Sequence, residues 1–158
     1  MKFFIKRNID GSNRAFTVFD EKGCEKYFAI FTKTKFPVVL EIVDTNFSHI
    51  AKIRQFPVMD TSTFVIKTGK KHMTLTVVAG KCGLNCFFYG SNWLIRGNPG
   101  AKNFYIIDVD NTVISNHKKH ADYYELDIHS GTNEIYCLAT SICIDLINTV
   151  DNLAIQAV

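Results

Sequence analysis

The sequence IYCLATSICIDLINTV, residues 135–150, is an almost unbroken apolar run that follows more than a hundred residues patterned as short β-strands. On a helical wheel its apolar side chains surround nearly the whole circumference, and Ser141, Asp145 and Asn148 share one narrow arc. A helix that is apolar on nearly all sides needs burial on all sides. The run therefore predicts one hydrophobic helix enclosed by a β structure.

A membrane-spanning helix is the alternative interpretation of this run. At 1.5 Å per residue, residues 135–150 span about 24 Å, which is less than the roughly 30 Å of a hydrocarbon core, and Asp145 would lie deep within it. We therefore expect no transmembrane segment. Thr132 or Asn133 is expected to cap the helix, and Glu134 in the first turn suits the positive end of the helix dipole.

Before the helix, a unit of strand, polar turn and strand recurs at intervals of twenty-four residues. Its copies are residues 16–30, 40–53 and 64–77, and further strands are expected at 93–97, 104–109, 112–116 and 123–128. Asp, Asn and Gly in the turns can bond their own backbone or adopt positive φ, as tight hairpins require. Many short antiparallel strands at regular spacing suggest a sandwich or a barrel, and closure into a barrel would remove the exposed edges of so long a meander.

The expected fold is thus mainly β with one C-terminal helix: a closed antiparallel β-barrel of about twelve strands that encloses a central hydrophobic α-helix. The length of 158 residues suits a single domain over residues 1–158. Lys6 and Arg7 interrupt the apolar start of the chain, so we expect no signal peptide and a cytoplasmic protein. Residues 1–101 carry 15 Lys and Arg against 7 Asp and Glu. This surplus of positive charge could form a basic face on the folded protein.

The five cysteines form an odd, irregularly spaced set, which favours reduced thiols over a disulfide framework. Cys82 and Cys86 are close in sequence and expected in one loop, but tetrahedral zinc needs four suitably spaced ligands. His117 and His120 are three residues apart, so on a strand their rings face opposite sides and cannot share a metal. We interpret them as a polar strand end and expect no metal and no cofactor.

The order of features over nearly the whole chain, strand and turn repeats and then the segments after residue 92, resembles the LURP-one-related proteins of the tubby C-terminal-like superfamily, which also includes the phospholipid scramblases. The segments that carry the resemblance are 93–97, 104–107, 113–119, 124–128 and the apolar helix with Asp145. The resemblance implies a single LURP-one-related domain, a barrel of about twelve strands around a central helix. Tubby-like domains bind phosphoinositides through surface Lys and Arg, but no such motif aligns here, so no site residue is transferred. The chain departs from the family pattern at 120–122, where it has His-Ala-Asp instead of aromatic residues.

The candidate lipid-binding residues are lysines, because ammonium groups bind lipid headgroups as point charges. They are Lys118, Lys119, Lys70 and Lys71, with Lys33 and Lys35 as further members, and each has the alternative of being an ordinary solvated lysine. Nucleic acid is not expected as a partner, because the aromatic residues fall mostly on apolar faces. Asp145 is interpreted as a structural anchor that meets a strand or the barrel mouth.

No catalytic constellation can be identified in the sequence, so we expect a protein that is not an enzyme. The expected function is a binding or scaffold module for anionic lipid headgroups of the phosphoinositide kind or for a protein partner, cytoplasmic and peripheral to the membrane. The alternatives are a scramblase-like protein that moves or shields an acyl chain, which requires an open lumen, and a protein with no small-molecule ligand.

Overall fold

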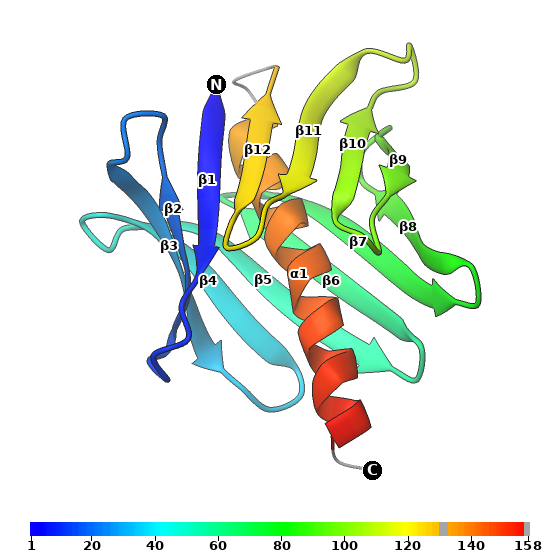
Figure 1. The fold of residues 1–158 in the computed structure, drawn as a ribbon, viewed down its shortest axis with the longest axis horizontal. Coiled ribbons are helices and arrows are strands. Elements are labelled where there is room, and N and C mark those ends of the chain that lie inside the picture. The colour runs from blue at the N-terminus through cyan, green and yellow to red at the C-terminus, as the bar shows by residue number, and fades with distance from the viewer. Residues whose placement is uncertain (130–132, 157–158) are drawn as a thin grey trace.

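The computed structural model describes residues 1–129 and 133–156, with side chains described as far as residue 147. These residues form twelve strands and one helix (Figure 1). The elements are β1 (Lys2–Arg7), β2 (Arg14–Phe19), β3 (Glu25–Lys33), β4 (Val38–Asp44), β5 (His49–Val58), β6 (Thr61–Thr68), β7 (Lys71–Gly80), β8 (Gly83–Tyr89), β9 (Leu94–Asn98), β10 (Asn103–Ile107), β11 (Val113–Lys119), β12 (Tyr124–Ile128) and α1 (Glu134–Gln156).

All strands belong to one antiparallel sheet in the order β8-β7-β6-β5-β4-β3-β2-β1-β12-β11-β10-β9. The first strand pairs with the last, with Phe3 opposite Leu126, so the sheet curls around α1. β8 and β9 form the two ends of the sheet and lie side by side without a ladder in the described part of the chain. The barrel is therefore nearly closed, which confirms the predicted class of a twelve-stranded antiparallel barrel around one helix.

Three of the connecting turns share one backbone design, in which an aspartate binds the turn that follows it. The Asp44 carboxylate accepts hydrogen bonds from the N–H groups of Asn46 and Ser48 at 2.9 and 3.0 Å. Asp20 and Asp108 accept the same pair of bonds two and four residues ahead of them. The fourth residue of each turn has positive φ, and it is Gly23, Phe47 or Asn111. The expectation of polar turns that bond their own backbone is confirmed.

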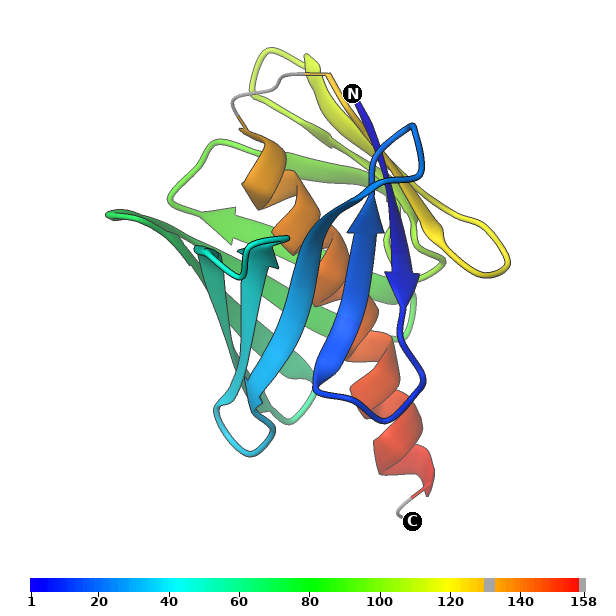
Figure 2. The same cartoon turned by 90° about the vertical axis from the view of Figure 1, so that its left-hand side faces the viewer.

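The helix α1 fills the barrel, and its side chains from Cys137 to Ile147 are all buried. It runs for 23 residues, about 35 Å, and so begins one residue before and ends six residues after the predicted 135–150. Its last turns leave the barrel (Figure 2). Asn133 directly precedes α1, while the alternative cap Thr132 and the side chain of Asn148 lie outside the described residues. Within the described part of the chain, no helix has both the length and the apolar character that crossing a membrane requires.

Because the strands alternate in direction, the loops gather at two mouths of the barrel. The helix-entry mouth surrounds the start of α1, where Tyr27 and Thr68 bond Glu134 and Tyr136. The helix-exit mouth surrounds the later part of α1 (Figure 1). Its six described loops are residues 8–13, 34–37, 59–60, 81–82, 99–102 and 120–123.

Two strands had not been predicted from the sequence. β1 lies in the segment considered only as a possible targeting signal, and it closes the barrel by pairing with β12. β8 contains Cys86, so the expectation of one loop holding both Cys82 and Cys86 is wrong. Cys82 lies in the preceding turn and Cys86 faces inward on β8.

Candidate functional site

The strongest polar cluster of the described residues surrounds Asp145, which is 2% exposed on α1. Its carboxylate accepts bonds from the ammonium of Lys102 and the hydroxyl of Tyr124. The Arg7 guanidinium lies 3.5 Å from the second carboxylate oxygen. One carboxylate thus links α1 to β1, β12 and the turn before β10. These contacts support the predicted role of Asp145 as a structural anchor.

Local structure explains how these partners reach a buried carboxylate. Lys102 ends the turn between β9 and β10, where its N–H bonds Pro99 O at 3.0 Å and its φ is 61°. Its ammonium also lies 5.1 Å from the centre of the Tyr124 ring, within the range of a cation–π contact. Burial, and then the bond to Asp145, raise the pKa of the Tyr124 hydroxyl. The hydroxyl therefore stays protonated and donates to the carboxylate.

A pocket of about 290 Å³ opens beside this cluster at the helix-exit mouth. Its lining includes the three basic residues Arg7, Lys102 and Lys119 and the two acidic residues Asp122 and Asp145. The three basic side chains exceed the two carboxylates by one charge, so the lining has a small positive surplus. The pocket can accept an anionic group of modest size.

The structure separates the predicted lipid-binding lysines into two places. Lys118 and Lys119 are exposed at the end of β11, and Lys119 lines the pocket beside Asp145. Lys70 and Lys71 are exposed at the helix-entry mouth and line a different pocket of about 400 Å³ with Tyr136 from the start of α1. One ligand therefore cannot use both pairs. Lys33 and Lys35 are also exposed, at the end of β3 and in the loop 34–37 of the helix-exit mouth.

His117 is not the polar strand end that the sequence suggested, because its ring is 3% exposed and faces the barrel interior. The ring nitrogens lie 2.9 Å from Ser141 Oγ on α1 and 3.0 Å from Ser115 Oγ on the same strand. The ring also stacks on Phe104, with centroids 4.2 Å apart. Burial lowers the pKa of His117 to about 3, so the imidazole is neutral near pH 7. The prediction was wrong because Ser141, on the polar arc of α1, faces His117 and Ser115 of β11. Polar groups of the helix and the strand therefore bond each other inside the barrel.

His120 lies just beyond β11, stacked on Tyr123 and 3.1 Å from the Glu125 carboxylate. The bond from His120 is the main cause that lowers the pKa of Glu125. His117 and His120 thus have separate surroundings, as their spacing predicted. Among the described residues, no three His, Cys, Asp or Glu side chains are grouped as a metal site requires.

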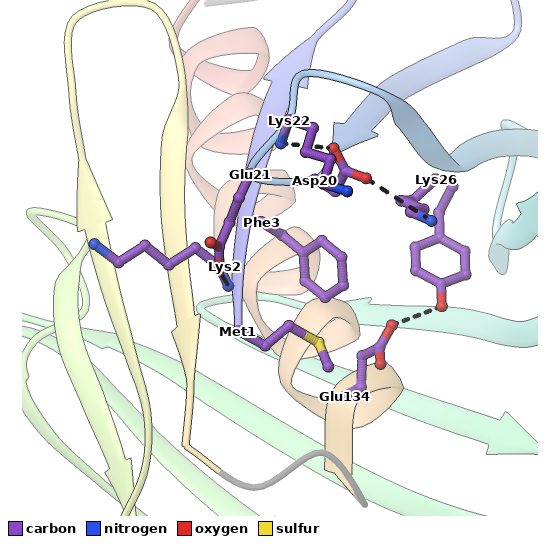
Figure 3. A pocket seen from close by; sticks show the side chains of 9 residues that line it. Met1, Lys2, Phe3, Asp20, Glu21, Lys22, Lys26 and Glu134 are labelled. Atoms are coloured by element: carbon purple, nitrogen blue, oxygen red, sulfur yellow. Dashed lines mark hydrogen bonds and ion pairs between the residues drawn. The ribbon is translucent and has the colours of Figure 1, made fainter.

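Another pocket, of about 380 Å³, also lies at the helix-entry mouth, apart from the one lined by Lys70 and Lys71 (Figure 3). Met1 and Phe3 provide apolar surface, and the Glu134 carboxylate accepts a 2.6 Å hydrogen bond from Tyr27. The other two carboxylates are also engaged. Glu21 accepts from the Lys2 N–H at 2.9 Å, and Asp20 binds its own turn and lies 3.8 Å from the Lys26 ammonium. These contacts hold the mouth together, so the pocket beside Asp145 is the stronger candidate.

The fold is that of a tubby-like barrel with a central helix, and the family comparison agrees. The LURP-one-related profile matches residues 1–145, so the chain belongs to the LURP-one-related family. A protein of Arabidopsis thaliana, known from its X-ray structure, has a similar fold with a TM-score of 0.61 and 9% sequence identity. The likeness covers 93% of this chain and 91% of that one. Among curated proteins, none matches this chain.

Proposed function

We propose that this protein is a non-enzymatic binding module for anionic, phosphate-bearing lipid headgroups, peripheral to the cytoplasmic face of a membrane. The observation that carries the proposal is a pocket at the helix-exit mouth in which the basic residues Arg7, Lys102 and Lys119 outnumber the two carboxylates, with Lys118 exposed beside it. Lys and Arg attract anionic lipid surfaces by about 1 kcal/mol per residue near the surface.

The burial of the one Ser–His arrangement among the described residues supports a non-enzymatic role. Ser115 and Ser141 both lie beside His117, but all three side chains are buried in the barrel. A substrate could reach them only if α1 left the barrel. We therefore assign the arrangement to the core rather than to nucleophilic catalysis.

Shielding of an acyl chain, the scramblase-like alternative, has less support. That activity needs an open lumen, whereas Leu138, Ile142 and Leu146 of α1 pack with the inward-facing strand residues in one hydrophobic core. A headgroup at the mouth needs no such space. A protein partner at the same basic surface is the competing binding function, and it would be independent of vesicles.

Sedimentation with vesicles tests the headgroup proposal. The wild-type protein should sediment with vesicles that contain about 30% phosphatidylserine or phosphoinositide and not with pure phosphatidylcholine, and about 0.5 M salt should weaken the association. The variant Lys118→Glu/Lys119→Glu should bind at least about tenfold more weakly, because two attractive charges become repulsive. The matched control, Lys70→Glu/Lys71→Glu, reverses the same charges at the other mouth and should keep wild-type binding.

Equal losses in the two variants would show attraction by net charge alone and would contradict a site at the helix-exit mouth. Absence of any association at low salt would remove the lipid proposal. Competition with inositol phosphate in solution distinguishes binding of a single phosphate headgroup from attraction to a charged membrane surface. Competition by it indicates that the pocket accepts a phosphate headgroup, whereas binding that only a vesicle supports indicates a charged surface.

A further inference from the structure

The helix-exit mouth also carries apolar side chains at the tips of its loops. Ile9 is 94% exposed in the loop 8–13, Phe36 is 61% exposed in the loop 34–37, and Met59 is 100% exposed in the turn 59–60. These three loops connect β1 to β2, β3 to β4 and β5 to β6. Since β1 to β6 are consecutive in the sheet, the three tips follow one another along one side of the mouth.

Single exposed apolar residues are common on soluble proteins and need no explanation. Met59 is different, because its φ is 56° and its side chain gains no burial in return. Gly or Asn would adopt this backbone conformation at lower cost. A fully exposed methionine at such a position suggests that the side chain is buried against something outside the chain.

Lysines and an arginine surround part of this row of tips, while Asp10 and Asp60 follow Ile9 and Met59. Lys33 precedes the Phe36 loop and Lys35 lies in it, Lys6 and Arg7 precede the Ile9 loop, and Lys118 and Lys119 lie across the mouth. Apolar side chains that enter the acyl boundary, next to lysines at headgroup level, are the pattern of proteins that lie on anionic membranes. A second copy docked mouth to mouth would place these lysines against each other.

We propose that the helix-exit mouth faces an anionic bilayer and that Ile9, Phe36 and Met59 insert into it. The inference rests on the proposed headgroup binding and adds an orientation and an apolar contribution to it. The lysines supply the salt-sensitive part of the affinity, and the three tips supply a part that salt does not screen.

The first experiment compares two sets of tip variants on phosphatidylcholine vesicles with about 30% phosphatidylserine. The variant Ile9→Ser/Phe36→Ser/Met59→Ser should lose at least about tenfold in partitioning, and its remaining binding should vanish at about 0.5 M salt. The control Phe47→Ser/Val109→Ser changes tips at the helix-entry mouth that are 57% and 62% exposed. It should bind as the wild type does. Circular dichroism checks that both variants fold.

The second experiment detects insertion directly. A Met59→Trp variant should show a blue-shifted emission and strong quenching by lipids brominated along the acyl chain. A Val109→Trp variant, at the opposite mouth, should show neither effect. Trp93 is buried in both proteins and contributes the same background.

The outcomes separate this inference from the headgroup proposal. If Lys118→Glu/Lys119→Glu loses binding while the triple tip variant binds normally and Met59→Trp is not quenched, the insertion is overturned and headgroup binding stands. If Met59→Trp is quenched but the lysine variant binds normally, the insertion is retained and the assignment of headgroup binding to Lys118 and Lys119 is overturned. If the tips instead control self-association in solution, with no quenching on vesicles, a second copy is the occupant and the insertion is overturned.

Discussion

The Lys102 ammonium binds the Asp145 carboxylate and so joins the turn between β9 and β10 to the central helix across 43 residues of sequence. The exposed fractions of the two side chains are 12% and 3%, so both charges are largely removed from water. A buried charge that loses its partner costs more than the pair contributes when intact. Removal of one partner should therefore destabilise the barrel.

Replacing Lys102 with Met should lower the free energy of unfolding by about 3 kcal/mol, because the Asp145 carboxylate stays buried with less compensation. Urea denaturation measures the change. The control is Lys118→Met, an exposed lysine whose loss should change stability by no more than about 0.5 kcal/mol. Adding Asp145→Leu to Lys102→Met should restore part of the loss. Two additive losses would contradict a direct energetic link between the charges.

The helix and its polar arc could be predicted from the sequence because both depend on spacing within one segment. Ser141 and Asp145 are one turn apart, and both do meet polar groups of the barrel wall. Their partners could not be predicted, since Arg7, Lys102 and Tyr124 come from three distant segments that only the sheet order brings together. Nothing in the local pattern distinguishes Lys102 from the exposed lysines.

The errors in the strands have a local cause. β8 contains an inward-facing set, Leu84, Cys86 and Phe88, that alternates with exposed residues, so its period of two was present in the sequence. The close spacing of Cys82 and Cys86 instead suggests a loop. In β11, Ser115 and His117 point inward although both are polar, because Ser141 of the helix faces them. A rule that places polar residues outside fails where two polar patches bury each other.

The Asp108 turn offers a test of the repeated turn design. Asp108→Ala should destabilise the protein by about 1–2 kcal/mol, because the carboxylate accepts hydrogen bonds from the N–H groups of Asp110 and Thr112 at 2.9 and 3.0 Å. Asp110→Ala is the matched control: it removes the same carboxylate from an exposed position in the same turn. Thermal denaturation measures the difference, and Asp108→Ala should melt at a lower temperature than Asp110→Ala. Equal melting temperatures would argue against the role of Asp108.

The cysteines should fall into two kinetic classes. Cys24 and Cys82 are exposed and should react within minutes with a thiol reagent at pH 8. Burial raises the pKa of Cys86 to about 12 and that of Cys137 to about 11, and it raises the pKa of Cys143 as well. Cys137 and Cys143 are buried and should react only as the barrel opens, and the half-buried Cys86 should react much more slowly than the exposed pair. A Cys24→Ser/Cys82→Ser variant should therefore lack the fast phase, and fast labelling of that variant would contradict the buried placement.

His117 makes a specific contribution to acid sensitivity. In the unfolded chain the imidazole takes up a proton below pH 6.5, whereas burial keeps it neutral in the folded barrel down to about pH 3. The unfolded state thus binds more protons between these values, so stability should fall with decreasing pH, by up to about 1.4 kcal/mol per pH unit. His117→Gln keeps a hydrogen-bonding side chain between Ser115 and Ser141 but cannot titrate. Its stability at pH 7 should be lower than that of the wild type, and its decline between pH 6.5 and 4.5 should be shallower. The carboxylates titrate alike in both proteins, so urea denaturation across this range isolates the histidine, and parallel declines would show that His117 takes up its proton without unfolding.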